Sequence, residues 1–535
     1  MLHALAPKRS RGFGRVWLSL ALGALWPLVV AAQDTKKGAT APSPKDASKA
    51  GAKAPSKGEG KDAEKGAPTD QGPSEQAQAG VVDVANVKKA EAVELFTDER
   101  DEALLPFDKF PQLPAVRGAP PVEEMKKMAT GAIPVNRDAI QKFVDAEAAS
   151  LTSHTYLKAL VDPESVSANP TNSVFREFNR ASTSLLEPLY IPAQAAVPQF
   201  KQLYNRALLA TLPKLLSHQL HVRSVAMLVL AKSGEPDCLP IFVKSLIDAD
   251  QVFAVNDWAA QGITNLAQEG RRDLESGKAN AAAKALSDFL QREEGAPWPI
   301  QMHALQALGA LRLATDTQGQ GNGEMANVAL KFLSDKNANP AVRAYAARAL
   351  GMMKWQQVAG FNYSLVAYHI GKATLDMGEK IASLYYEKEE AVEVAPKKTT
   401  KKSVPTKKNS WVEANSVQAS RLTGYIMFGI VPGLLGEDGV RDSGITKAPN
   451  LGNTRKQVDE ISKRVQAVAV AAYNLTSPTA AKSEKPKAKK ELDSALAALK
   501  DALAKNPPSG RKLVPDGPDF PGPGAEVAGA TPAAK

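Results

Sequence analysis

Apolar side chains recur through the centre of this chain with the spacing of one face of an α-helix. Val342, Ala346 and Leu350 follow one another at intervals of four residues, which places them on the same side of a helix. The same order of a large apolar residue, an alanine and a second large apolar residue occurs three times upstream, at Val222/Ala226/Leu230, Val255/Ala259/Ile263 and Ile300/Ala304/Leu308. The steps between the four segments are 33, 45 and 42 residues. A period in this range predicts stacked pairs of helices.

Partner helices are predicted between the repeated ones. Residues 238–247, 281–290 and 325–333 carry apolar residues at helical spacing, and short polar turns follow the first and the third. Further helical patterns precede the array, and the first of them begins at a capping residue, Asn136 or Asp138. Because no alternating pattern separates these patterns, the sequence predicts an all-α fold class.

The repeated segments resemble the second helix of HEAT repeats. Asn339-Pro340-x-Val342-Arg343 matches the helix-entry pattern of that family, and Ala349-Leu350-Gly351 matches its exit. The resemblance covers roughly residues 201–357 and implies a short HEAT-like α-α superhelix, a solenoid in which each unit is stable only against its neighbours. The sequence departs from the family where Asn256 and Gln301 replace the arginine of the Val-Arg step, and where glycines lengthen the connection at 319–323.

The N-terminus has the order of a secretory signal. Basic residues up to Arg15 precede an apolar run from Val16 to Val30, and Ala31 and Ala32 then supply the small residues of a cleavage site. The run is shorter than the ~20 residues that cross a bilayer. The one cysteine of the chain lies far away, at Cys238, so none is available there for a lipid anchor. We therefore expect cleavage, no later membrane-spanning segment, and a secreted or periplasmic protein; an uncleaved anchor is the alternative.

Composition divides the remaining chain into folded and unfolded segments. Residues 34–80 contain no Leu, Ile, Phe, Tyr or Trp, so they cannot bury enough apolar surface to offset the entropy of ordering. The predicted order is a signal peptide 1–32, a disordered linker 33–90, an N-terminal helical segment 91–199, a solenoid with capping helices 200–390, a Lys-rich linker 391–410, a C-terminal helical segment 411–475 that folds back onto the solenoid, and a tail 476–535 that is largely disordered apart from helical potential at 491–505.

The formal charge of +10 raises the question of an anionic partner. The excess lies outside the predicted core, in two clusters: Lys397, Lys398, Lys401, Lys402, Lys407 and Lys408 in one, and Lys482, Lys485, Lys487, Lys489 and Lys490 in the other. Neither cluster interleaves aromatic residues, as single-strand binding favours, so solvated linkers are preferred to a nucleic-acid site. An anionic envelope polymer is the alternative partner for these lysines.

No motif in the sequence places a catalytic, cofactor-binding or metal-binding residue. His218 and His221 stand three apart, but no third ligand follows at metal-site spacing. The glycine-rich run 429–436 resembles a phosphate loop only superficially, because Glu437 and Asp438 follow where a lysine and a hydroxyl residue are required. Without a Gly-x-Ser-x-Gly elbow either, we expect a non-enzymatic protein.

These observations predict an exported scaffold or adaptor that binds another macromolecule through a helical surface, and a protein is the expected partner. Its candidate contact residues are polar and aromatic members of the repeated helices, expected to point away from the packed stripe: Arg223, Asn256, Trp258, Gln301, Arg343 and Arg348. For Arg223 and Arg343, a structural role toward the neighbouring turn is the alternative. Two other classes stay open: an envelope-associated protein that binds anionic polymers through its Lys-rich linkers, and a lyase-like enzyme subunit, since phycobilin lyases share the Val-Arg-x-x-Ala-Ala-x-Ala-Leu-Gly pattern.

Overall fold

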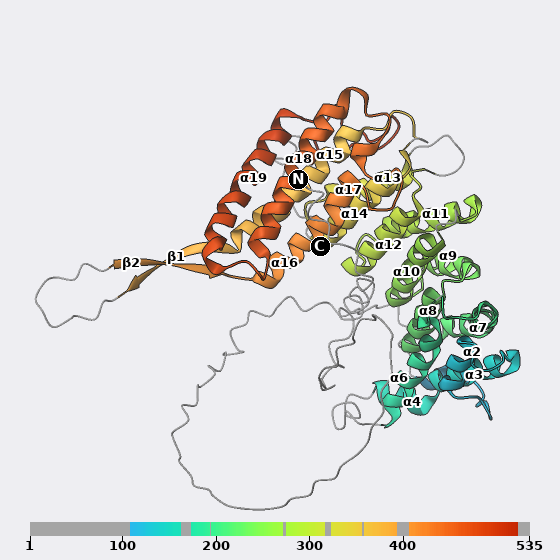
Figure 1. Ribbon diagram of the computed structural model, residues 1–535. Helices are drawn as coiled ribbons and strands as arrows, with labels where there is room; N and C mark the ends of the chain where they lie inside the picture. Colours follow the sequence, from blue (N-terminus) through green and yellow to red (C-terminus); the bar gives the residue numbers. More distant parts are fainter. Residues whose placement is uncertain are drawn as a thin grey trace, which may run out of the picture. The chain divides into compact units, whose positions relative to one another are not determined.

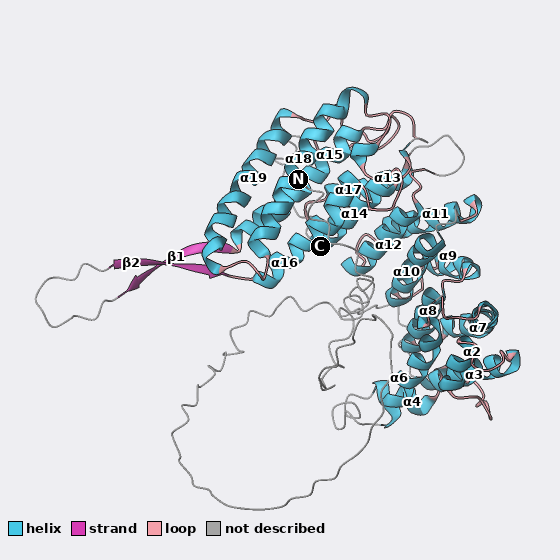
Figure 2. Cartoon of the chain, viewed as in Figure 1, coloured by secondary structure: helices cyan, strands magenta, loops and turns pink. Residues whose placement is uncertain are grey.

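The described part of the chain is built almost entirely from α-helices in the computed structural model (Figure 1, Figure 2). The structure describes residues 107–161, 173–192, 194–270, 274–315, 323–355, 358–392 and 406–522. Within these ranges the named strands are two that pair with each other. The prediction of an all-α fold class is confirmed for this part. The predicted signal peptide and the linker 33–90 lie outside the described residues.

The described chain begins with a group of N-terminal helices. They are η3 (Phe107–Lys109), α2 (Val122–Ala129), α3 (Arg137–Leu151), α4 (His154–Val161), α6 (Ser173–Leu186), η4 (Glu187–Tyr190), α7 (Pro198–Thr211) and η5 (Leu212–Ser217). Asn136 caps α3, because its side-chain oxygen accepts hydrogen bonds from the backbone N–H groups of Asp138 and Ala139. Of the two predicted capping residues, Asn136 is therefore the correct one.

The repeated helices form one row and their partners form a second. The first row consists of α8 (Leu220–Ser233), α10 (Phe253–Gly270), α12 (Trp298–Leu311) and α14 (Pro340–Met352), each in contact with the next. The second row consists of α9 (Leu239–Ile247, after the short η6, Pro236–Cys238), α11 (Ser276–Arg292), α13 (Glu324–Ser334) and α15 (Tyr363–Ser383), again in contact in this order. Contacts of α10 with α9, of α12 with α11 and of α14 with α13 and α15 join the two rows.

The apolar triplets of the sequence are the packing stripe of the first row. Every member of the four triplets, from Val222 to Leu350, is 0% exposed. Small residues allow the helices of this row to approach closely: a Cβ atom added to Gly309 of α12 would lie 2.8 Å from the Cα atom of Ala349 in α14. Burying one valine or leucine contributes roughly 1.5–3 kcal/mol, so the stripe is a principal source of stability here.

The C-terminal segment packs onto the two rows. It contains α16 (Ser416–Tyr425), a π-helical turn η8 (Ile426–Ile430), α17 (Val431–Leu435), η9 (Ile445–Lys447), η10 (Gly452–Thr454), α18 (Arg455–Thr476), η11 (Lys482–Glu484) and α19 (Lys485–Lys505). Helices α16, η8 and α17 contact α14, whereas α18 and α19 contact α15 and each other. Two helices alone are marginally stable, which is why the sequence predicts that this segment folds back.

Both ends of the predicted Lys-rich linker 391–410 belong to a β-hairpin. Strands β1 (Tyr385–Val392) and β2 (Thr406–Glu413) pair antiparallel, from Tyr385 opposite Glu413 to Val392 opposite Thr406. Tyr385 is buried at the base of the hairpin, with its ring centroid 6.3 Å from that of Trp411. The lysine content did not reveal this pairing, because an antiparallel ladder satisfies backbone groups whatever the side chains. Residues 393–405 of the linker lie outside the described residues.

The structure also corrects the predicted tail, because residues 485–505 form α19. Leu496 and Leu503 of α19 pack where α15 has glycines: a Cβ atom on Gly378 would lie 2.5 Å from Leu496, and one on Gly371 would lie 2.7 Å from Leu503. Residues 506–522 are packed as well, with Leu513, Val514 and Phe520 buried. The leucines of α19 pack against glycines of α15. The lysine-rich sequence of α19 itself does not indicate this contact.

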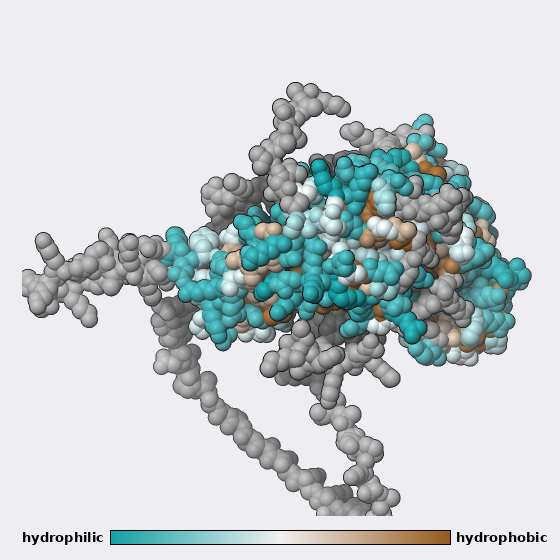
Figure 3. Space-filling view, turned by 90° about the horizontal axis from the view of Figure 1, so that it is seen from above, coloured by the Kyte–Doolittle hydropathy of each residue, from teal (hydrophilic) through white to brown (hydrophobic). Residues whose placement is uncertain are grey.

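The surface seen in Figure 3 is largely hydrophilic, with apolar side chains in separate patches. Among the helices that the structure describes, none combines the length and the apolar character that crossing a bilayer requires. The uncharged run 422–435 is divided between α16, η8 and α17, and its glycines Gly429 and Gly433 face α14.

Candidate functional site

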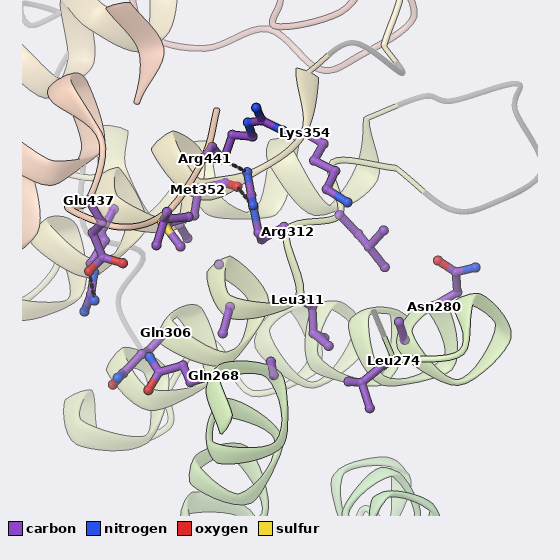
Figure 4. A pocket seen from close by; sticks show the side chains of 18 of the residues that line it. Gln268, Leu274, Asn280, Gln306, Leu311, Arg312, Met352, Lys354, Glu437 and Arg441 are labelled. Atoms are coloured by element: carbon purple, nitrogen blue, oxygen red, sulfur yellow. Dashed lines mark hydrogen bonds and ion pairs between the residues drawn. The ribbon is translucent and has the colours of Figure 1, made fainter. Parts of the chain in front are cut away.

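A pocket of about 960 Å³ opens at the C-terminal ends of α10, α12 and α14, and the start of α11 and the loop 437–441 complete its wall (Figure 4). Three kinds of side chain line it: the amides Gln268, Asn280 and Gln306, the charged residues Arg312, Arg348, Lys354, Arg441, Glu437 and Asp438, and apolar residues that include Leu274, Leu311 and Met352. Ligand sites commonly enclose about 300–1,000 Å³ and combine apolar walls with a few convergent polar groups. The pocket has both properties.

Arg312 joins three elements at the centre of this pocket. It follows α12 with φ of 61°, in the left-handed region that residues other than glycine rarely adopt. Its Nε atom donates to the carbonyl oxygen of Met352 at 3.1 Å, and its Nη2 atom donates to that of Arg441 at 2.6 Å. The backbone N–H of Lys354 donates in turn to the Arg312 carbonyl oxygen at 3.0 Å. Since these carbonyl partners are uncharged, the guanidinium adds positive potential to the pocket.

Arg348 forms an ion pair with Glu437 in the pocket wall. Its Nη2 atom contacts Oε1 of the glutamate, and its guanidinium carbon lies 5.8 Å from the ring centroid of Tyr345. The side chains of Arg348 and Glu437 are 19% and 24% exposed, so solvent reaches the pair. Burial raises the pKa of the Tyr345 hydroxyl, and the nearby Arg348 opposes that shift. Arg348 is the one predicted contact residue that lines the pocket.

The loop that carries Glu437 is held by its backbone. Gly436 and Gly444 have φ of 87° and 92°, and a Cβ atom on Gly436 would lie 2.1 Å from the carbonyl oxygen of Ser443. The Glu437 N–H donates to Oγ of Ser443 at 2.9 Å, and the Gly444 N–H donates to the carbonyl oxygen of Gly351 at 2.6 Å. The glycine-rich run 429–436 therefore serves a close helix crossing and this turn.

Four of the predicted contact residues are buried. Each follows the first member of an apolar triplet, and each donates a side-chain hydrogen bond to a backbone carbonyl oxygen of the preceding turn or helix end: Arg223 to His218, Asn256 to Gln251, Gln301 to Glu294 and Arg343 to Leu333. They are at most 8% exposed. This corrects the expectation that they point away from the packed stripe. For Arg223 and Arg343, the alternative of a structural role toward the neighbouring turn is the one observed. A buried carbonyl needs a donor, and this register supplies one in every unit.

Trp258 and a neighbouring polar cluster lie on the first row. Trp258 is half-buried, with the ammonium of Lys232 at 5.7 Å from its ring centroid, so it stays a candidate contact residue. The Nδ1 atom of His303 on α12 lies 2.6 Å from Oδ1 of Asp257 on α10, and Nε2 of Gln261 donates to the other carboxylate oxygen at 2.8 Å. This cluster links adjacent helices of the first row.

Other residues with reactive side chains have structural partners. Cys238 is buried 3.6 Å from Oγ of Ser233, and burial raises the pKa of its thiol to about 11, which disfavours the nucleophilic thiolate. The Nε2 atom of His218 lies 3.0 Å from the carbonyl oxygen of Pro111, whereas Nδ1 of His221 interacts with Gln219. Among the described residues, no group of three or more His, Cys, Asp or Glu side chains is arranged to hold a metal ion.

The structure also corrects the interpretation of one lysine cluster. Lys485 is 5% exposed, and its Nζ atom donates to the carbonyl oxygens of Leu475 and Ser477 at the end of α18. Cations at a helix C-terminus are stabilised by the free carbonyls there. Lys489 pairs with Asp493 on the same helix. This cluster is therefore the start of a packed helix, and it is not a solvated linker.

Comparison with known proteins gives no match for this chain. No family model matches the chain, and no curated protein and no solved structure shows a significant similarity to it. The chemistry of the described residues is therefore the basis for any functional conclusion.

Proposed function

We propose that this chain is an exported, non-enzymatic scaffold or adaptor, in which a HEAT-like helical array binds an extended segment of a partner protein. The HEAT-like assignment is supported by the order of contacts within the two rows and by the burial of the four apolar triplets. In such arrays neighbouring units stabilise one another, and the side chains outside the packing stripe are available for binding.

The observation that carries the proposal is the composition of the pocket at the ends of α10, α12 and α14. Primary amides such as Gln268 and Gln306 both donate and accept hydrogen bonds, which suits the N–H and C=O groups of a peptide backbone. Leu274 and Leu311 offer apolar wall to a peptide side chain. Recognition of a segment in this pocket needs no acid–base or metal chemistry.

Photo-crosslinking from the pocket tests the proposal. We expect that p-benzoylphenylalanine in place of Gln268, an exposed pocket residue, gives one discrete polypeptide adduct when the full chain is irradiated in its own cells. The matched control is the same replacement of Gln291, an exposed glutamine of α11 that does not line the pocket. Identical adducts from both positions, or no adduct from position 268, would contradict a partner at the pocket.

Export is tested separately, at the N-terminus. Because basic, apolar and small residues follow one another there, we expect removal of the segment through about Ala32. Mass spectrometry of the native protein should find a mature end near Gln33 in a secreted or periplasmic fraction. Intact Met1 in a membrane fraction would show that the segment is retained as an anchor.

A further inference from the structure

We propose that the pocket binds a carboxylate of an acidic peptide at Arg348, in the place that the carboxylate of Glu437 now occupies, so that Glu437 is an intramolecular competitor of the ligand. This inference rests on the proposed function, since it names the ligand chemistry of the same pocket. It predicts that removing the Glu437 charge strengthens binding, whereas an ordinary contact residue would weaken it.

The first argument is the surplus of positive charge around the pocket. Four cationic residues line it, Arg312, Arg348, Lys354 and Arg441, against the two acidic residues Glu437 and Asp438. The Arg312 guanidinium donates to the backbone carbonyl oxygens of Met352 and Arg441, and these bonds leave its charge uncompensated. A concave site with an excess of one sign of charge concentrates ligands of the opposite sign.

The second argument is the position and exchangeability of the Glu437 carboxylate. Arg348 is held beside the ring of Tyr345, and its guanidinium meets Glu437 where both side chains reach solvent. An arginine presents a planar set of donors that suits any carboxylate. The two side chains are 19% and 24% exposed, so solvent screens the pair and reduces its net stability. A carboxylate supplied by a ligand is therefore able to replace the internal one.

The third argument is that the loop does not depend on the Glu437 side chain. The Arg312 guanidinium holds the Arg441 carbonyl, Ser443 holds the Glu437 N–H, and the Gly444 N–H is bonded to Gly351. The carboxylate is thus free to leave Arg348 while the loop keeps its place at the rim. This makes Glu437→Gln a clean substitution, because it removes one charge and preserves the backbone contacts.

Amide side chains favour a peptide over a polysaccharide or another polyanion. Neither the Oδ1 nor the Nδ2 atom of Asn280 has a hydrogen-bond partner among the described residues, although both atoms are buried. Gln268 and Gln306, from α10 and α12, line the pocket as well (Figure 4). Unsatisfied or adaptable amides, together with the leucines of the wall, fit the alternating backbone and apolar groups of a peptide.

The test measures fluorescence anisotropy of a labelled hexaglutamate peptide with the full mature chain at physiological ionic strength. We expect Glu437→Gln to bind about three- to tenfold more tightly than the unaltered chain, the range for releasing an ion pair that solvent partly reaches. Arg348→Gln should bind at least about tenfold more weakly. In the Arg348→Gln background, the Glu437→Gln change should have no further effect, because both act on one contact.

Asp438→Asn is the matched control, since it removes the same charge from the neighbouring exposed residue of the loop. It should change affinity by less than about twofold at an ionic strength that screens exposed charges. Equal tightening by both loop variants would mean general electrostatics, and weaker binding by Glu437→Gln would make Glu437 part of the recognition surface. Either result overturns the inference.

Two further probes complete the test. Hexaglutamine should not bind, and oligogalacturonate should bind more weakly than hexaglutamate; equal or tighter binding of the sugar acid would overturn the assignment to a peptide. Absence of hexaglutamate binding by Glu437→Gln would also overturn the inference. If the photo-crosslink from position 268 persists in that case, the proposed function stands and the ligand chemistry alone is wrong.

Discussion

Val342→Asp is expected to unfold the two rows of helices or to loosen them severely. Val342 is 0% exposed in α14, so the change removes roughly 1.5–3 kcal/mol of apolar burial. It also buries a carboxylate without a partner, which costs several kcal/mol more. A domain is stable by only about 5–15 kcal/mol. Because each unit is stabilised by its neighbours, the damage should extend to α12 and α10.

Urea unfolding measures the loss of stability, and hydrogen exchange measures how far it extends along the helices. The matched control is Val470→Asp, the same substitution at a position of α18 that is 44% exposed, where a change within about 0.5 kcal/mol is expected. Arg348→Ala should also be mild, at most about 1 kcal/mol, because solvent reaches both members of its ion pair. Small and equal effects at Val342 and Val470 would show that the apolar register is misassigned.

Gly351→Ala is expected to detach the C-terminal segment from α14. A Cβ atom at Gly351 would lie 2.1 Å from the carbonyl oxygen of Gly433 and 2.5 Å from its Cα atom. These are backbone atoms, which cannot move aside as a flexible side chain does. Overpacking typically costs about 1–3 kcal/mol and more where the backbone must shift. The loss also acts on the pocket, since the Gly351 carbonyl holds the Gly444 N–H.

Hydrogen exchange across residues 416–447, together with thermal unfolding, tests this expectation. Gly424→Ala is the control, because Gly424 lies in α16 with no heavy atom within 4 Å of an added Cβ. Alanine is favoured over glycine in a helix by about 1 kcal/mol, so this variant should be neutral or slightly stabilised. If the two variants behave alike, α14 and α17 do not cross as closely as described.

The sequence by itself determined the helical fold class and the packing stripe. The triplets at i, i+4 and i+8 identified Val342, Ala346 and Leu350 as buried, and each equivalent triplet is buried as well. It also located the partner helices, within a few residues except for the early start of α11. These features are local: the apolar face of a helix follows from residues within a few turns, so the spacing alone reveals it.

The polar residues of the same helices show where local pattern stops being informative. Arg343 and Arg348 stand on one helix with similar surroundings in sequence, yet Arg343 is 5% exposed, with its Nε donating to the carbonyl of Leu333, whereas Arg348 lines the pocket. A long charged side chain reaches its partner across helices. The identity of that partner depends on which segments, far apart in the sequence, pack together, and the spacing of residues within one helix does not reveal this.

Only the tertiary structure decided the pocket, the hairpin and the position of α19. Arg312 and Arg441 are 129 residues apart, and Arg348 and Glu437 are 89 apart, so no local motif joins them. The lysine-rich start of α19 predicts a solvated linker. In the structure, leucines of α19 pack against Gly371 and Gly378 of α15. The period of the apolar residues specifies which face of a helix is buried. The segment that covers this face is specified by complementary shape and long-range hydrogen bonds, which exist only in the folded chain.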